Sequence, residues 1–172
     1  MRDLNAMPVA TAISVEEYLE TIYRPDCEYL EGEVLERNVG EWDHSRLQTL
    51  LSRYLGNREK EWGITVVVEQ RVQIKPRRFR IPDITVLFMP PAGPIITEPP
   101  FLCIEILSPR DRVGEMQDRI DDYLAFGVRY VWLIHPRTRR AFVYTTEGVR
   151  EVKDGVLCTE EPKLCVSFSD LE

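Results

Sequence analysis

The sequence predicts an α/β fold in which a mixed β-sheet is flanked by α-helices. Runs rich in β-branched and aromatic residues, typical of strands, alternate with two long segments whose apolar residues recur at helical spacing. The expected order is a helix, a strand, a helix, three strands, a helix and two strands. At 172 residues the chain is long enough for one hydrophobic core. We therefore expect a single domain over residues 1–172, with a flexible segment at 1–13.

The first elements are predicted by capping and periodicity. Ser14 and Glu17 form a capping-box pattern, in which each side chain bonds the backbone N–H of the other residue. A short helix should therefore run to about Tyr23. A strand is expected over 33–39, because its residues alternate between apolar and polar. From 44 to 62, leucine and aromatic residues recur at helical spacing, which predicts a long helix with one apolar face.

The middle of the chain holds three strand-like runs, at 64–74, 81–88 and 101–107, all rich in β-branched or aromatic residues. The segment 89–100 separates the last two and contains five prolines and one glycine. Proline cannot donate a hydrogen bond to a neighbouring strand, so this segment cannot be a central strand. We expect it to be a loop.

The last third begins with a helix expected over 114–126, because its apolar residues face one side and Gly127 can end it. Two strands, at 130–134 and 140–145, should follow on either side of a turn. The tail past Asp154 is irregular in pattern and is expected to contribute at most a final edge strand.

Composition excludes several classes of protein. No apolar run approaches the roughly 20 residues that span a bilayer, and the N-terminus lacks a signal-peptide layout. We therefore expect no membrane contact and a cytoplasmic location. Cys27, Cys103, Cys158 and Cys165 form no Cys-x-x-Cys pair, and all four are expected to be reduced. The net charge of −7 argues against a general nucleic-acid coat protein, although basic residues cluster just before Asp83.

Two acidic residues stand inside apolar runs that otherwise predict buried strands. They are Asp83, after Ile81-Pro82, and Glu105, between Ile104 and Ile106. A buried carboxylate loses its hydration, which is costly unless a cation or hydrogen-bond donors replace the water. On neighbouring strands the two would repel, and a divalent ion bound by oxygen ligands is the simplest remedy. The plain alternatives are a turn residue for Asp83 and an ion pair with an arginine for Glu105.

These acids belong to blocks that resemble the Uma-two family of restriction-endonuclease-like proteins, within the PD-(D/E)XK nuclease superfamily. Residues 27–33 are similar to the family's Tyr-Glu-Leu-Ile-Asp-Gly-Glu, 105–109 to its Glu-Val-Leu-Ser-Pro, and 123–132 to its Tyr-x-x-x-Gly-Val-x-x-x-Trp. His44 stands where the family has a histidine starting its first long helix. The resemblance spans roughly residues 14–171. It implies a restriction-endonuclease-like core, DNA as the substrate and a homodimer.

The resemblance also implies a Mg²⁺ site, with Mn²⁺ as a substitute, held by Asp83, Glu105 and the backbone carbonyl of Ile106. The superfamily's lysine normally lies two residues after the second acid, where this chain has Leu107. In the family a lysine on the following helix takes over, and Arg119 stands at that position. Arginine can stabilise a phosphate but cannot act as a general base, because it stays protonated. The alternative for Arg119 is an ion pair on the helix surface.

Four further residues are candidates for the site. Glu33 could be a third catalytic acid that binds metal through water, or simply an exposed residue at the start of a strand. His44, Gln70 and Arg80 are candidates for contact with phosphate, water or substrate. The runner-up function is a catalytically degenerate nuclease fold that binds DNA or a protein, which the apolar Leu107 favours. A metal-free hydrolase using two carboxylates is a third possibility.

Overall fold

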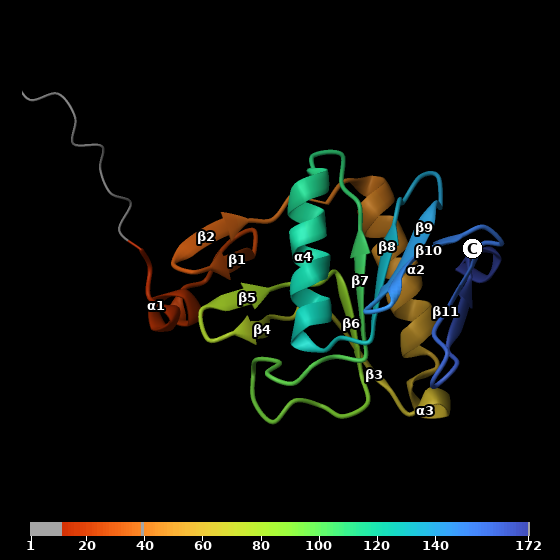
Figure 1. Ribbon diagram of the computed structural model, residues 1–172, viewed down its shortest axis with the longest axis horizontal. Coiled ribbons are helices and arrows are strands. Elements are labelled where there is room, and N and C mark those ends of the chain that lie inside the picture. The colour runs from red at the N-terminus through yellow and green to blue at the C-terminus, as the bar shows by residue number, and fades with distance from the viewer. Residues whose placement is uncertain (1–11, 39, 172) are drawn as a thin grey trace, which may run out of the picture.

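The computed structural model describes residues 12–38 and 40–171, which form two main sheets and a C-terminal hairpin (Figure 1). The six-stranded sheet has the order β10-β9-β8-β7-β6-β3, and the four-stranded sheet has the order β2-β1-β5-β4. The elements of the N-terminal half are α1 (Val15–Glu20), β1 (Cys27–Leu30), β2 (Glu33–Glu36), α2 (Trp42–Gly56), α3 (Glu59–Trp62), β3 (Thr65–Val68), β4 (Val72–Lys75), β5 (Arg78–Arg80) and β6 (Ile84–Leu87). Those of the C-terminal half are β7 (Leu102–Ile106), α4 (Val113–Phe126), β8 (Tyr130–Ile134), β9 (Ala141–Thr145), β10 (Gly148–Val152), β11 (Val156–Cys158), β12 (Cys165–Ser167) and a 3₁₀ turn (Phe168–Leu171).

The six-stranded sheet lies between two helices, α2 on one face and α4 on the other (Figure 1). Successive strand residues point to opposite faces. On β7, Ile104 and Ile106 belong to the hydrophobic core beneath α2, whereas Cys103 belongs to the core beneath α4. The same alternation places Glu105 on the α4 face. Strands β7 and β8 are parallel, and α4 connects them.

The four-stranded sheet packs its aromatic side chains against α1. Tyr18 of α1, Tyr29 of β1 and Phe79 of β5 are fully buried together. The tyrosine rings of Tyr18 and Tyr29 stack with their centroids 5.0 Å apart. Residues 1–11 of the expected flexible segment lie outside the described residues, while the Ile13 N–H bonds the Gly32 carbonyl at 3.0 Å. Helix α1 and strand β1 are fixed to β5 by this aromatic packing and by the pairing of β1 with β5, and β5 leads directly to Asp83.

The expected mixed sheet with flanking helices is confirmed, but several boundaries differ. The run 64–74 forms two strands in different sheets, because the chain turns at Glu69, whose φ is 51°. The expected helix 44–62 is divided into α2 and α3 near Asn57, and the expected strand 33–39 ends at Glu36. No helix within the described ranges has both the length and the apolar character to cross a bilayer. The strands β1, β5, β10 and β11 were not predicted.

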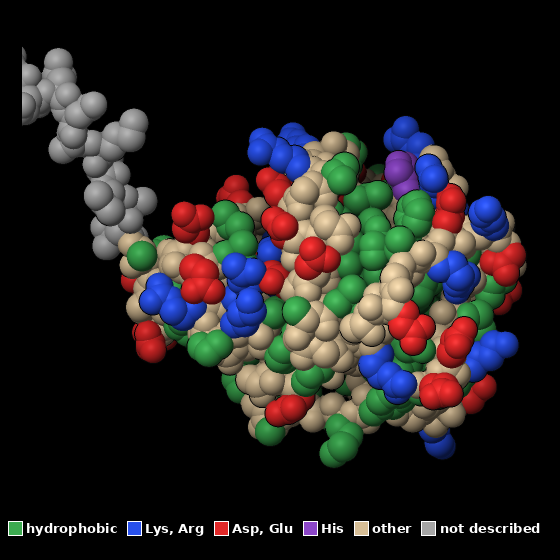
Figure 2. Space-filling view, viewed as in Figure 1, with side chains coloured by type: hydrophobic (Ala, Val, Ile, Leu, Met, Phe, Trp, Pro, Cys, Tyr) green, Lys and Arg blue, Asp and Glu red, His purple; other side chains and the backbone are tan. Residues whose placement is uncertain are grey.

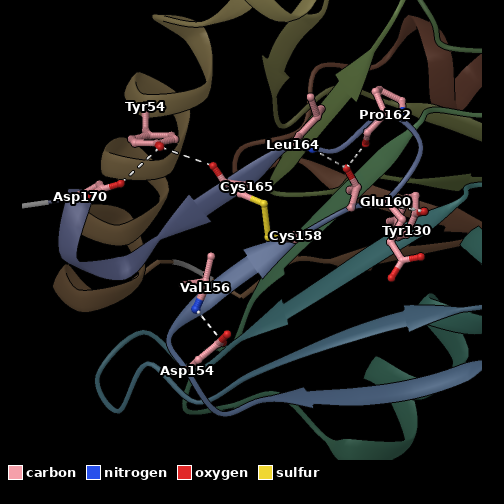
Figure 3. The surroundings of a disulfide bond; sticks show 11 residues. Tyr54, Tyr130, Asp154, Val156, Cys158, Glu160, Pro162, Leu164, Cys165 and Asp170 are labelled. Atoms are coloured by element: carbon pink, nitrogen blue, oxygen red, sulfur yellow. Dashed lines mark hydrogen bonds between the residues drawn. A yellow bond between two sulfur atoms is a disulfide. The ribbon is translucent and has the colours of Figure 1, made fainter.

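The expectation that all four cysteines are reduced is wrong for two of them. Cys158 and Cys165 face each other across the β11–β12 hairpin and form a disulfide (Figure 3). Cys27 and Cys103 are buried free thiols, as expected. The hairpin is tied to α2, because the Tyr54 hydroxyl donates to the Cys165 carbonyl at 3.4 Å. The disulfide therefore links the two strands of a hairpin whose apolar residues belong to the hydrophobic core beneath α2.

Removing this disulfide should destabilise the protein moderately. Replacing Cys158 and Cys165 together with serine should lower the free energy of unfolding by about 2–3 kcal/mol, the value for a short closed loop. Urea unfolding under oxidising conditions measures the change. In a reducing buffer the wild type should fall to the stability of the double variant, which should itself not respond to the reductant. Equal stability of the wild type in both buffers would show that the bond contributes nothing.

Candidate active site

Asp83 and Glu105 face each other across the β6–β7 ladder. Ile84 pairs with Ile104 in antiparallel register, and continuing this register places Asp83 opposite Glu105. The backbone N–H of Ile106 donates to Asp83 Oδ2 at 2.7 Å. Asp83 is 2% exposed and Glu105 is 1% exposed. The structure thus brings together the two acids that the sequence singles out.

Asp83 is held as a carboxylate by the side chains of Arg37, just after β2, and of His44. Arg37 Nη2 lies 2.5 Å from Oδ1, and His44 Nε2, in the first turn of α2, lies 3.2 Å from Oδ2. Burial favours the neutral acid, but the bond to His44 and the charge of Arg37 outweigh it and lower the pKa of Asp83. Burial likewise opposes a charged His44 ring, yet the bond to Asp83 and its charge raise the pKa of His44.

Glu105 lies beneath α4, where two residues four positions apart on one helix face reach it. The Tyr123 hydroxyl donates to Oε1 at 2.6 Å, and Arg119 Nη1 donates to Oε2 at 3.4 Å. Complete burial is the largest influence and raises the pKa of Glu105 to about 7, with Arg119 opposing it and Asp83 adding to it. Glu105 is therefore the member of the pair that takes up a proton near neutral pH.

A third buried acid, Glu28 of β1, was not singled out from the sequence as a site residue. It is 2% exposed and accepts hydrogen bonds from Arg80 Nη1 at 2.7 Å and from the Ile81 N–H at 3.2 Å. Arg119 Nε lies 3.2 Å from Glu28 Oε1, so Arg119 bridges Glu28 and Glu105. The signal was present, because Glu28 also stands between residues that are apolar and buried, Cys27 and Tyr29.

Of the three other candidates, Glu33 and Gln70 are placed away from this centre, whereas Arg80 is bound within it. Glu33 is exposed at the start of β2, and no hydrogen bond or ion pair within the described residues joins it to the buried acids. Gln70 donates to the Pro94 carbonyl at 2.7 Å, in the turn between β3 and β4. Arg80 is only 4% exposed, and its guanidinium joins Glu28 to Asp122, with Nε donating to Asp122 at 2.8 Å. Both ends of the Arg80 guanidinium are therefore engaged by carboxylates of the protein.

We call the three acids and their partners the carboxylate cluster: Glu28, Asp83 and Glu105 with Arg37, His44, Arg80, Arg119 and Tyr123. Each of the three acids pairs with an arginine of the cluster, which offsets the free-energy cost of burying the carboxylate. The side chains of Arg37 and Arg119 are 14% and 17% exposed, more than those of the acids they cover. A ligand approaching from solvent would therefore meet these two guanidinium groups first.

The high pKa of Glu105 has a consequence for stability. Without metal, the folded protein should lose stability as the pH rises from about 4.5 to about 7, because the folded state keeps a proton that the unfolded chain releases. Glu105→Gln cannot titrate and should remove this slope, which is on the order of 1–3 kcal/mol across the window. His44 titrates in both proteins, so the difference between them isolates Glu105.

Urea unfolding in EDTA across this pH window measures the effect. Parallel stability profiles for the wild type and Glu105→Gln would contradict the raised pKa of Glu105.

Comparison with known proteins adds two findings. The model of the Uma2 family, described as “Putative restriction endonuclease”, matches residues 15–169, which include every member of the carboxylate cluster. A crystal structure described as “a putative nuclease belonging to DUF820 from Anabaena variabilis” is similar to this chain with a TM-score of 0.78 and 25% sequence identity. The similarity covers 92% of this chain and 97% of that chain. No curated protein matches the chain.

Proposed function

The chain belongs to the Uma2 family, as its sequence blocks predict, and from this premise we propose that it is an endonuclease that hydrolyses phosphodiester bonds of DNA at Asp83 and Glu105. The observation that carries the proposal is the pairing of these two buried acids across β6 and β7, with the Ile106 N–H fixing Asp83 at 2.7 Å. Two acids at facing positions of a buried ladder repel each other. Burying such a pair costs free energy, which the arginine partners of the two acids only offset, and a functional site explains why the pair is present.

We propose that the pair holds Mg²⁺, with Mn²⁺ as a substitute, and that the Ile106 carbonyl is a further ligand. Within the described ranges no group of three or more His, Cys, Asp or Glu side chains forms a ready metal site. Mg²⁺ needs only one or two carboxylates and keeps several waters. The donor set fits, because a carboxylate has about four lone-pair sites. Glu105 uses two of these, for Tyr123 and Arg119, and one lone pair of Asp83 Oδ1 is left beside Arg37.

When bound, the ion would supply Lewis acidity, which lowers the pKa of a coordinated water and offsets charge on the phosphate. The chain's own residues prepare the centre for this. Arg37 and His44 keep Asp83 ionised, and in the metal-free protein Arg37 supplies the positive charge at Asp83 Oδ1. Tyr123 fixes the orientation of Glu105 through its 2.6 Å hydrogen bond. Because Arg37 is partly exposed, it can turn outward when another cation takes its place.

Arg119 is assigned an electrostatic role at the phosphate. It lies between Glu28 and Glu105, and it is charged at any ordinary pH because its pKa is raised by these carboxylates. A guanidinium in this position can contact a phosphate oxygen but cannot remove a proton from water. Glu28 fixes Arg119 in place, and this buried acid replaces Glu33 as the third acid of the proposed centre.

Substitution of Arg119 tests this assignment. Arg119→Ala should slow plasmid cleavage by about 100-fold, the usual cost of losing one electrostatic contact to the reacting group. Arg119→Lys keeps the charge and adds a possible base, so its cleavage rate should equal or exceed that of the wild type. Arg129, an exposed arginine in the turn after α4, gives a matched control in Arg129→Ala. If Arg119→Ala cleaves as fast as this control, the assignment is wrong.

A degenerate nuclease fold that binds DNA or a protein is the second candidate. It is favoured by Leu107 at the superfamily's lysine position and by the arginine partner of each buried acid. In that case the wild type should bind without cutting in either metal ion. If the protein cuts both strands of a duplex, we propose a homodimer, since the carboxylate cluster is the only such centre among the described residues.

A further inference from the structure

A cavity of about 480 Å³ lies beside the carboxylate cluster, between α4 and the strands β8 and β9. We call it the α4 cavity. Figure 2 shows hydrophobic side chains in the hollow between α4 and these strands. Its floor is formed by side chains of β7, α4 and β8, and its wall includes the ring of Tyr144 on β9. The floor residues are Leu107, Met116, Ile120 and Leu133. The volume lies in the range of small-molecule sites.

Two residues connect this cavity to the proposed reacting centre. His44 lines the cavity while its Nε2 contacts Asp83. Leu107 is two residues after Glu105 and therefore points to the same face of the sheet, about 7 Å further along the strand. A nucleotide whose phosphate lies at Asp83 and Glu105 would have its base, or that of its neighbour, within reach of the cavity.

Most charges at the mouth, though not that of Glu41, are paired within the described part of the protein. Asp43 pairs with Arg137 at 3.1 Å, and Asp111 accepts bonds from the Ser108 N–H at 2.6 Å and from Asn38 at 2.7 Å. A phosphate would gain little from an apolar floor and a rim most of whose charges are already paired. A neutral, flat ring with a polar edge suits both features, because its faces contact the floor and Tyr144 while its edge reaches the rim.

From this arrangement we propose that the α4 cavity binds an unpaired nucleobase of the substrate strand. The proposal rests on the proposed function and deepens it. A paired and stacked base cannot enter the cavity without leaving the duplex, which costs free energy. This cost is smaller for a mismatched base and absent for an unpaired one. The substrate class is therefore nucleic acid with single-stranded or readily unpaired nucleotides. Arg112 beside the mouth pairs with Glu115 at 3.6 Å, but both side chains are exposed, at 82% and 65%. Because exposed ion pairs are weak, Arg112 can exchange Glu115 for a phosphate of the strand outside the cavity.

The test measures binding in EDTA, so that it does not depend on cleavage. The probes are a short single strand of 2-aminopurine deoxynucleotides, an abasic strand of the same length and a duplex of the same sequence. The wild type should change the 2-aminopurine fluorescence and bind this strand about tenfold more tightly than the abasic strand or the duplex, the effect of one stacked base. Equal affinity for the base-bearing and abasic strands, or no binding of either, would overturn the proposal.

Two variants with matched controls locate the effect. Tyr144→Ala removes the aromatic wall, and Phe142→Ala removes a half-buried ring on the same strand outside the cavity. Gln117→Glu places a carboxylate at the cavity, and Ala125→Glu places one elsewhere on the exposed face of α4. Only the first variant of each pair should lose the tenfold preference. Equal behaviour within both pairs would overturn the cavity as the binding place.

Cleavage of the same strands in Mg²⁺ separates this proposal from the proposed function. Base-dependent binding without cleavage would overturn the nuclease function and leave the base site standing. Cleavage without any preference for the base-bearing strand would overturn the base site alone.

Discussion

Replacing Arg80 with methionine should lower the free energy of unfolding by about 3–5 kcal/mol, the usual cost of leaving a buried charge without its partner. Arg80 is 4% exposed and joins Glu28 of β1 to Asp122 of α4, at 2.7 and 2.8 Å. Its loss would remove the most buried counter-ion of two buried carboxylates, leaving Glu28 with Arg119 and Asp122 with Arg78, both more exposed. Since domains of this kind have only about 5–15 kcal/mol of stability, the variant should be close to unfolding at room temperature.

Urea unfolding checks this result, and Arg77→Met is the matched control. Arg77 is 55% exposed and lies 3.9 Å from Glu31, a geometry in which ion pairs contribute little. Its substitution should change the stability by less than about 0.5 kcal/mol. If Arg80→Met is as stable as this control, Arg80 does not hold the four-stranded sheet against α4. The substrate contact expected from the sequence would then regain support.

Asp83→Asn should reduce the rate of nucleic-acid cleavage by about 100- to 1000-fold. The amide keeps the shape of the side chain but removes the charge that Arg37 and His44 stabilise and that the proposed metal ion would need. Transition-state stabilisation by a bound metal ion amounts to several kcal/mol, and each 1.4 kcal/mol corresponds to about tenfold in rate. The rate is measured on a plasmid with Mg²⁺ at saturating protein.

Asp118→Asn is the control for this second variant, because Asp118 is exposed on α4 and makes the same change of charge. Circular dichroism should show both variants folded. A cleavage rate for Asp83→Asn within about twofold of Asp118→Asn would mean that the proposed centre is in the wrong place.

The sequence contained a direct signal for the two central acids. An acidic residue inside an apolar strand is rare enough to mark a site, and both Asp83 and Glu105 carry this mark. This mark is local, so it can be recognised from neighbouring residues alone. Arg119 was predicted from its position in the family resemblance, whereas Tyr123, which also reaches Glu105 from α4, was not singled out as a site residue.

Other parts of the site depend on pairings between distant segments, and the local sequence signals them weakly, as for Glu28, or not at all. Glu28 and Glu33 both stand in the block that resembles the family, and only the pairing of β1 with β5 shows that Glu28 is the buried one. Arg37 belongs to no motif, and it reaches Asp83 because the chain after β2 passes over the end of the ladder. The first three of the four residues of β1 are all buried, so the strand lacks the alternation between buried and exposed residues that predicts a strand.

The disulfide was missed for a related reason. Cys158 and Cys165 are seven positions apart, and that spacing alone does not reveal that they face each other across a hairpin. The break in the 64–74 run likewise depends on the positive φ of Glu69, which no pattern of apolar residues predicts. In both cases a turn decides which residues face each other.

The most direct test of the central claim is plasmid cleavage by the wild-type protein in Mg²⁺, in Mn²⁺ and in EDTA. If Asp83 and Glu105 form a metal-dependent phosphodiesterase centre, the plasmid should be nicked or linearised with at least one of the two ions, and EDTA should abolish the reaction. Cleavage that persists in EDTA would contradict the metal site. An intact plasmid with both ions would contradict the nuclease function itself and favour a binding module.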